Sequence, residues 1–363
     1  MLKNPSKTAD ITRLILPAVR RLKAYHIDET PCRIKLDAME NPFPLPEAVR
    51  MEIVGATAKV RINRYPDPLA KQLTKAIAKL WGMDPDRMLL GNGSDELIQT
   101  ILLAFGGPVL IPVPTFAMYE LTARALSQEV VTVPLNEDFA LDADALLKKA
   151  RLARARVIFL ACPNNPTGNR FSDKAVRTIL DKAKAAVVLD EAYFSFSGKT
   201  YLPLLKKYPN LIILRTLSKI GFAGLRIGVL TASPKIVEEL NKIRLPYNIN
   251  ALSQTAAVIA LKHRDVLDQQ ISRLISERTT LYNELSRMPG VTAFPSETNF
   301  ILFRTAVDAT IVYNELKRAG ILIKNLNRPG PLRNCLRMTI GTPEENAACT
   351  KKLRSILLQI GTM

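Results

Sequence analysis

Short apolar runs alternate with helical periodicities through the central part of the chain. Segments 69–81 and 95–105 have the apolar spacing of amphipathic helices. The apolar runs are too short for helices and show no polar alternation, which is typical of strands buried on both faces of a parallel sheet. They lie at residues 109–111, 157–160, 186–189 and 211–214. This pattern predicts an α/β lobe with a largely parallel sheet covered by helices on both faces.

Sequence patterns toward both ends of the chain predict a smaller α+β lobe. Residues 34–39 alternate like a strand, and the prolines among residues 42–46 exclude regular structure there. After a long charged helical stretch at 263–287, alternation returns at 300–303 and 336–340. The expected division is an N-terminal arm at 1–28 with a short amphipathic helix, a large lobe at 48–262, and a small lobe from 29–47 and 263–363.

Composition narrows the class of protein. The chain has 363 residues, and its four cysteines and two histidines are scattered, which indicates neither a disulfide framework nor a zinc cluster and fits a reducing cytoplasm. The formal charge of +18 is spread along the chain without a long basic run, so we expect no nucleic-acid partner. A basic balance also suits a pocket that handles anions.

One uncharged stretch is long enough to imitate a membrane span. Residues 97–119 carry no charge, but two glycines and three prolines predict a helix, a turn and a short strand instead. The amino terminus is interrupted by charges and proline before any apolar run, so we expect no signal peptide and no membrane association.

A short loop carries three groups that together can hold a phosphorylated aldehyde. Lys219 follows Ser218 directly, and Arg226 comes seven residues later. An amine, a hydroxyl and a guanidinium in one loop can form a Schiff base and bind a phosphate. Partly removed from water, the Lys219 amine can lose its proton near neutral pH. Taken alone, a lysine after a strand is more often a surface residue.

Two motifs that precede this loop support the same interpretation. Asp190 directly follows a predicted strand, three residues before Tyr193, and Asn165 lies in an Asn-Asn-Pro-Thr-Gly turn. Ligands bind at the carboxyl ends of strands in sheets of this kind. The alternatives are an aspartate that caps a helix or turn and an asparagine that serves turn geometry.

A glycine-containing loop before a predicted helix is a candidate phosphate site. Gly93, Ser94 and Asp95 stand where backbone N–H groups and the helix dipole favour an anion. The same residues also suit an ordinary loop and helix cap.

The segments around Asn165, Asp190 and Lys219, in this order, resemble the fold type I aminotransferases that depend on pyridoxal 5'-phosphate (PLP). Neighbouring segments narrow the resemblance to the histidinol-phosphate aminotransferases, from about Tyr25 to Gly341. The resemblance implies a mostly parallel seven-stranded sheet, a smaller α+β lobe, PLP as the cofactor and a homodimer. It also implies reversible amino transfer between L-histidinol phosphate and 2-oxoglutarate, with L-glutamate as the other amino compound, in L-histidine biosynthesis. An aromatic aminotransferase and a threonine-phosphate decarboxylase are the alternatives.

The resemblance assigns roles on the cofactor side. It implies that Lys219 forms the Schiff base and that Asp190 pairs with the pyridine nitrogen, while Tyr193 and Asn165 donate to the phenolic oxygen. Ser218 and Arg226 would complete the phosphate site at Gly93, Ser94 and Asp95. Tyr119 matches a position where relatives lay an aromatic ring on the cofactor.

On the substrate side, the alternation at 336–340 places Arg337 on the face opposite to the apolar residues, where a guanidinium can clamp an anion. The resemblance makes Arg337 that clamp and gives Asn165 a substrate contact as well. Tyr25, Tyr247 and Lys324 fall where relatives contact the substrate phosphate, although many relatives have arginine in place of Lys324. Tyr65 matches a tyrosine that reaches the cofactor phosphate of the neighbouring subunit.

Overall fold

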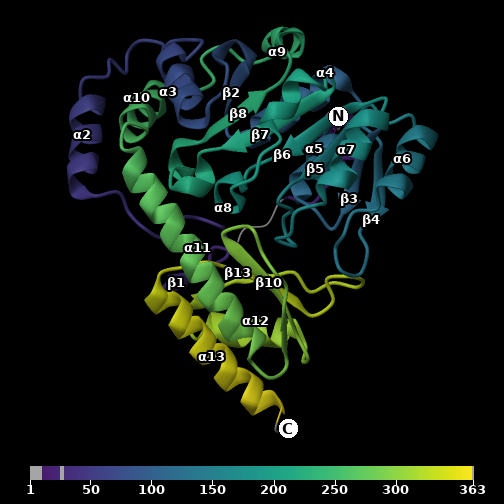
Figure 1. Cartoon of the computed structure of the whole chain (residues 1–363), viewed down its shortest axis with the longest axis vertical. Helices are drawn as coiled ribbons and strands as arrows, with labels where there is room; N and C mark the ends of the chain where they lie inside the picture. The colour runs from purple at the N-terminus through teal and green to yellow at the C-terminus, as the bar shows by residue number, and fades with distance from the viewer. Residues whose placement is uncertain (1–9, 25–27, 362–363) are drawn as a thin grey trace, which may run out of the picture.

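The computed structural model describes residues 10–24 and 28–361, and its larger lobe is built on a seven-stranded sheet (Figure 1). The strand order is β2-β8-β7-β6-β5-β3-β4, in which β8 runs antiparallel to β2 and β7 and the other neighbours are parallel. This confirms the predicted mostly parallel sheet. The strands are β2 (Met88–Asn92), β3 (Val109–Val113), β4 (Val130–Pro134), β5 (Val157–Ala161), β6 (Ala186–Asp190), β7 (Leu211–Thr216) and β8 (Ile227–Thr231).

Side chains of the central strands alternate between two apolar cores, one on each face of the sheet. Along β5, Ile158 and Leu160 face the core that α6 (Ala143–Leu152) and α7 (Asp173–Lys182) cover. Val157 and Phe159 face the opposite core, against α4 (Ser94–Phe105), α5 (Ala117–Ala125) and α9 (Pro234–Asn241). Burial on both faces explains why these strands are continuous apolar runs in the sequence.

Three helices flank the β2 end of the sheet: α2 (Glu47–Thr57), α3 (Lys71–Trp81) and α10 (Ala251–Ala260). The short elements are α1 (Pro17–Arg20), α8 (Phe194–Ser197) and the 3-10 turns η1 (Ile11–Leu14), η2 (Pro85–Arg87), η3 (Leu202–Lys206), η4 (Ser218–Ile220) and η5 (Ala223–Leu225).

The smaller lobe joins the carboxyl third of the chain to a segment near the amino end. An antiparallel sheet has the order β12-β13-β10-β9, and β1 (Ile34–Lys35) pairs in parallel with β11 (Ile321–Leu322). The helix α11 (Arg264–Ser286) runs from the larger lobe into the smaller one (Figure 1). The remaining elements are β9 (Val291–Ala293), β10 (Phe300–Thr305), β12 (Lys324–Asn325), β13 (Cys335–Thr339), α12 (Ala309–Arg318) and α13 (Pro343–Gly361).

Local patterns overestimated two elements. The alternation at residues 34–39 yields only the two-residue strand β1, because its partner β11 is itself only two residues long. The helix expected in the arm is a 3-10 turn followed by the four-residue helix α1. Residues 97–119 form most of α4, then β3 and the start of α5, as predicted.

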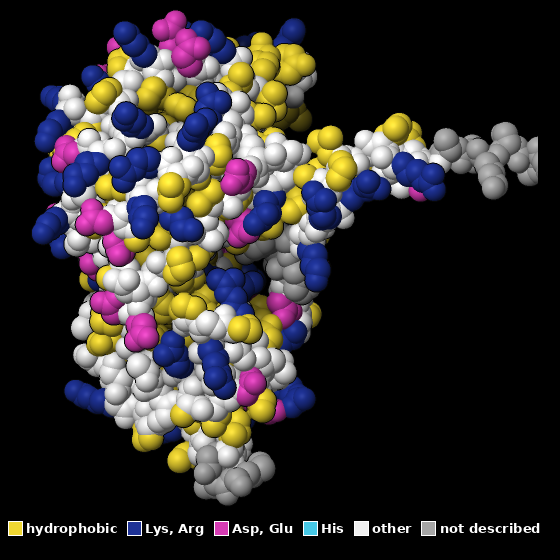
Figure 2. All heavy atoms as spheres, turned by 90° about the vertical axis from the view of Figure 1, so that its right-hand side faces the viewer, with side chains coloured by type: hydrophobic (Ala, Val, Ile, Leu, Met, Phe, Trp, Pro, Cys, Tyr) yellow, Lys and Arg dark blue, Asp and Glu magenta, His cyan; other side chains and the backbone are white. Residues whose placement is uncertain are grey.

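The face of the molecule that Figure 2 displays carries many basic side chains. Figure 2 shows Lys and Arg side chains spread over both lobes on the face that it displays. In the described part of the chain, no helix is both long enough and apolar enough to cross a membrane.

Candidate active site

The carboxyl ends of β6 and β7 border a cavity of about 540 Å³, a volume that includes its open mouth. Asp190 is the last residue of β6, and Lys219 lies in η4 just after β7. The sequence-predicted residues that line the cavity are Ser94, Asp95, Tyr119, Asn165, Asp190, Tyr193, Ser218, Lys219 and Arg226. Tertiary structure therefore brings together residues that are more than one hundred positions apart.

Asp190 is a buried carboxylate held by two donors. The Tyr119 hydroxyl donates to Oδ2 at 2.6 Å, and the Ala192 N–H donates to Oδ1 at 3.0 Å. Burial raises the pKa of Asp190 to about 6, although both hydrogen bonds act in the opposite direction. The charged form would be stabilised by a cationic N–H group in the cavity.

Tyr119 has a role that the sequence did not reveal. Its ring is fully buried and stacked on Phe159, with 4.7 Å between the centroids, while its hydroxyl holds Asp190. Burial, followed by the charge of Asp190, raises the pKa of Tyr119 well above its ordinary value, so the hydroxyl stays protonated as a donor. Phe116, which sequence analysis missed, also lines the cavity and is only half-buried.

Lys219 is a partly buried amine whose pKa is lowered to about 8, first by removal from water and then by the positive charge of Arg337. Its Nζ lies 5.8 Å from the centre of the Tyr193 ring. A lysine with this pKa has a substantial neutral fraction near pH 8, and the neutral amine is the nucleophilic form.

The loop before α4 approaches other backbone closely enough to require glycine. Gly93 has a φ of 81°, and a Cβ there would lie 2.5 Å from Nη2 of Arg226. A Cβ on Gly228, in the neighbouring strand β8, would lie 2.4 Å from the backbone nitrogen of Ser94. The two glycines allow the amino end of α4 to lie directly against β8 and Arg226.

Arg226 and Ser218 complete an anion site at this helix end. Arg226 Nη2 lies 3.2 Å from Oδ2 of Asp95. The Thr216 hydroxyl, which sequence analysis also missed, donates to Ser218 Oγ at 2.9 Å and accepts from the Ser218 N–H at 3.0 Å. Backbone N–H groups, a hydroxyl and a guanidinium are the donor set that binds a phosphate.

Arg337 reaches the same region from the small lobe. As the alternation predicted, Leu336 and Met338 pack in the small-lobe core. Arg337 Nη1 donates to Asn165 Oδ1, and Nη2 donates to the Asp37 carbonyl at 2.9 Å. The Asn165 amide in turn donates to the Tyr193 hydroxyl at 3.3 Å, so Asn165 links the two lobes across the cavity.

Five of the expected substrate and cofactor contacts within the described residues do not line the cavity: Gly93, Tyr65, Tyr247, Lys324 and Arg337. Lys324 is paired with Arg337 across β12 and β13, and residues paired in this way project from the same face of a sheet. Tyr65 is 81% exposed and stacks on Tyr247, with 4.4 Å between ring centroids. Tyr25 falls outside the described residues.

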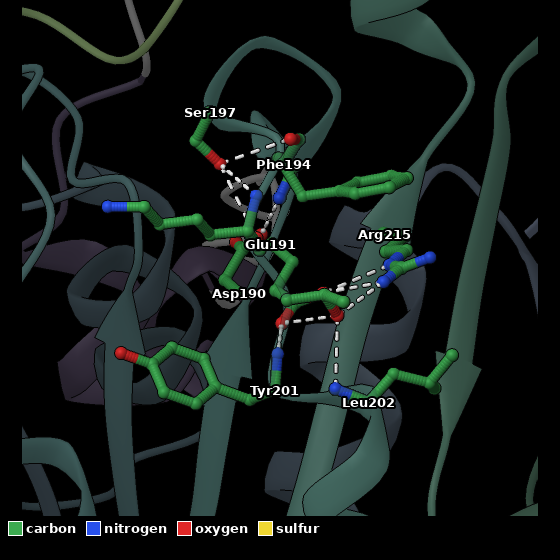
Figure 3. Close-up of polar contacts among 10 residues, drawn as sticks. Asp190, Glu191, Phe194, Ser197, Tyr201, Leu202 and Arg215 are labelled. Atoms are coloured by element: carbon green, nitrogen blue, oxygen red, sulfur yellow. Dashed lines mark hydrogen bonds and ion pairs between the residues drawn. The ribbon is translucent and has the colours of Figure 1, made fainter. Parts of the chain in front are cut away.

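A buried ion pair beside the site was not predicted (Figure 3). The Glu191 carboxylate accepts from Nε and Nη2 of Arg215 at 3.0 and 2.8 Å, and both side chains are almost completely buried. The Tyr201 N–H also donates to Glu191 at 2.6 Å, and the Arg215 guanidinium lies 3.6 Å from the centre of the Phe194 ring. Both charged residues adjoin recognised motifs, but no local pattern indicates that they pair.

A metal-based site finds no support in the part of the chain that the structure describes. Within residues 10–24 and 28–361, no three His, Cys, Asp or Glu side chains are grouped so that they could hold a metal ion.

Comparison with known proteins identifies relatives over almost the whole chain. The family model for aminotransferase class I and II matches residues 33–353. Histidinol-phosphate aminotransferase 2 of Nitrosococcus oceani is 43% identical over 95% of this chain and 98% of its own length. The crystal structure of histidinol-phosphate aminotransferase from Sinorhizobium meliloti, in complex with pyridoxal-5'-phosphate, has a TM-score of 0.86 at 25% identity, covering 95% of this chain and 98% of that one.

A decarboxylase is also structurally similar. The L-threonine-O-3-phosphate decarboxylase of Porphyromonas gingivalis has a TM-score of 0.78 at 27% identity, covering 90% of this chain and 99% of that one. A shared fold therefore does not by itself separate amino transfer from decarboxylation.

The raised pKa of Asp190 predicts how its replacement affects stability. Because the folded protein holds this proton more tightly than the unfolded chain does, the contribution of Asp190 to stability falls as pH rises from about 4 to 6. Asp190→Asn keeps a side chain of the same shape without the charge. In ligand-free protein, its melting temperature relative to wild type should rise between pH 4 and pH 7, by about 3 °C. If the melting temperatures of the variant and wild type differ by the same amount at pH 4 and pH 7, burial does not raise the pKa of Asp190.

Proposed function

Since the chain belongs to the class I and II aminotransferases and, within them, to the histidinol-phosphate aminotransferases, we propose that the residues of this cavity carry out its PLP-dependent amino transfer. The enzyme interconverts L-histidinol phosphate and 2-oxoglutarate with imidazole-acetol phosphate and L-glutamate, a step of L-histidine biosynthesis. The observation that carries the assignment is the position of Lys219 and Asp190 on one cavity beside an anion site.

The residues present fit PLP. Asp190 is a buried carboxylate whose raised pKa calls for a cationic N–H partner, and the helix end with Arg226 and Ser218 suits a phosphate. When bound, PLP supplies an electron-accepting ring conjugated to an aldehyde, which allows a proton to leave the alpha carbon of the substrate.

Lys219 has two tasks in this proposal. Its amine, whose lowered pKa favours the neutral form, would be the group that holds the aldehyde of PLP. With an amino substrate in the site, the same amine would be a base of suitable pKa to move the proton at the alpha carbon. Asp190 keeps the ring nitrogen protonated, with Tyr119 and the Ala192 N–H holding its carboxylate in place.

The substrate anion binds on the small-lobe side. Arg337 presents a guanidinium fork to a carboxylate or a phosphate, and Asn165 links it to Tyr193. Lys324 adds a second positive charge on the neighbouring strand, directly opposite Arg337. Two adjacent cations suit the dianionic phosphate of histidinol phosphate.

A second copy of the chain covers one apolar face of the large lobe in this proposal. Ile62, Tyr65, Leu245 and Leu252 are exposed there, and the stacking of Tyr65 on Tyr247 joins the two segments that carry them. In such a dimer, Tyr65 of each chain would help to hold the cofactor phosphate of the other. Light scattering at micromolar concentration should give the mass of two chains, and a mass of one chain would contradict the proposal.

The proposal also places the enzyme in the cytoplasm. All four cysteines are free thiols in the structure, and a reducing compartment keeps thiols in that form.

The direct test adds L-histidinol phosphate to the PLP-loaded enzyme and follows the visible absorption of the bound cofactor. The absorption should bleach, and 2-oxoglutarate should restore it. Lys219→Ala should lose both the wild-type absorption and at least about a thousandfold in kcat, since the variant lacks the nucleophile and the base. Lys242→Ala, which removes an exposed lysine paired with Glu239, is the matched control and should behave as wild type.

The outcomes separate the alternatives. Release of carbon dioxide would indicate a decarboxylase, and bleaching by an aromatic amino acid but not by histidinol phosphate would indicate an aromatic aminotransferase. An unchanged absorption with every amino donor would leave a protein that binds the cofactor without turnover.

Two glycines in one segment test the phosphate site. Gly228→Ala should displace the loop at Ser94 and weaken PLP binding at least about tenfold, or about 1.4 kcal/mol. Gly224→Ala is the control, because a Cβ there meets nothing within 4 Å. Titration of the ligand-free variants with PLP measures the effect, and circular dichroism checks that both are folded. Equal affinity in the two variants would show that the loop does not bind the phosphate.

A further inference from the structure

Met39 has a strained backbone that neighbouring residues hold in place. Its φ of 54° lies in the left-handed region, which is uncommon for residues other than glycine. Its N–H donates to the Thr339 hydroxyl at 3.0 Å, and its carbonyl accepts from the Asn299 amide at 2.9 Å. Both partners are buried residues of the small lobe. Strain that is fixed by hydrogen bonds on both sides of a residue is characteristic of functional sites.

The chain around Met39 crosses between the two lobes at the cavity. Two residues before it, the Asp37 carbonyl accepts from Arg337 at 2.9 Å. Two residues after it, the Asn41 amide lies 2.8 Å from the Gln270 side chain and 3.5 Å from the carbonyl of Ile220, the residue that follows Lys219. Met39 is therefore fixed between the anion clamp and the nucleophile, and its side chain lines the cavity.

The other cavity-lining groups leave few candidates for contact with an apolar ring. The charged and hydrogen-bonding side chains serve the cofactor or the anion in the function proposed above. Among the apolar residues that line the cavity, only Met39 and Phe116 have long side chains, since the others are alanines and a proline. Phe116 lies edge-on to Tyr119, on the Asp190 side, with 5.5 Å between centroids. Met39 is the long apolar side chain on the Arg337 side.

We propose that Met39 contacts the imidazole ring of histidinol phosphate and thereby favours ring-bearing substrates over linear ones. This inference rests on the proposed function and assigns a specificity-determining residue to it. A thioether makes favourable contacts with aromatic rings, and its flexible side chain adapts to a site that must also accept glutamate. Met39 is buried and belongs to the apolar core of the small lobe, so packing holds its side chain where the residue borders the cavity.

The two half-reactions provide an internal control. Single-turnover bleaching of the bound cofactor is measured with L-histidinol phosphate and, separately, with L-glutamate. Met39→Ala and Met39→Asn should lower kcat/KM for histidinol phosphate about tenfold, because they remove the apolar and thioether contact. The same preparations should react with glutamate within about twofold of wild type, which also shows that their sites are folded and loaded. Met39→Leu, apolar and of similar volume, should stay within about threefold for both substrates.

Equal losses in both half-reactions would overturn the inference, since they would show a general positioning role for the segment. An unchanged rate with histidinol phosphate in Met39→Ala would overturn it as well. The proposed function fails in a distinguishable way: wild-type enzyme would react with glutamate and leave histidinol phosphate unchanged, and the inference would then fall with it.

Discussion

The ion pair between Glu191 and Arg215 is the constraint on which the geometry of the site depends. Each residue is next in the chain to a residue that lines the cavity, because Glu191 follows Asp190 and Arg215 precedes Thr216. The Glu191 N–H also donates to the Leu214 carbonyl at 2.8 Å, so backbone and side chain both join the ends of β6 and β7. A charge buried at this depth is tolerated only when it is paired, so the two strand ends are held in one relative position.

Burial in the cavity between these strand ends disfavours the charged forms of Asp190 and Lys219. Burial raises the pKa of Asp190 to about 6 and lowers that of Lys219 to about 8, so each is shifted toward its neutral form. A ligand with a cationic ring nitrogen and an electrophilic carbon satisfies both residues together. The same desolvation that is unfavourable in the free protein thus prepares an acid and a nucleophile for one cofactor.

In the proposed function, the small lobe supplies the substrate side through segments from both ends of the chain. Arg337 comes from β13, while Asp37 and Met39 come from the segment after β1. These segments are hydrogen-bonded to each other. Asn165 of the large lobe accepts a hydrogen bond from Arg337 across the cavity. The two residues to which we assign the substrate anion and the substrate ring therefore belong to the same hydrogen-bonded unit.

Sequence alone determined the elements and the chemistry that local patterns encode. The apolar runs of β3, β5, β6 and β7 were predictable because strands buried on both faces must be apolar, and Lys219, Asp190 and Arg226 stand in short motifs with distinctive residue types. Only the tertiary structure decided which side chains meet. The pairing of Glu191 with Arg215, the hydrogen bond from Tyr119 to Asp190 and the position of Met39 depend on segments that fold together from distant parts of the chain. No periodicity or spacing along the chain encodes such contacts, because they depend on how segments that are distant in the sequence pack within each lobe.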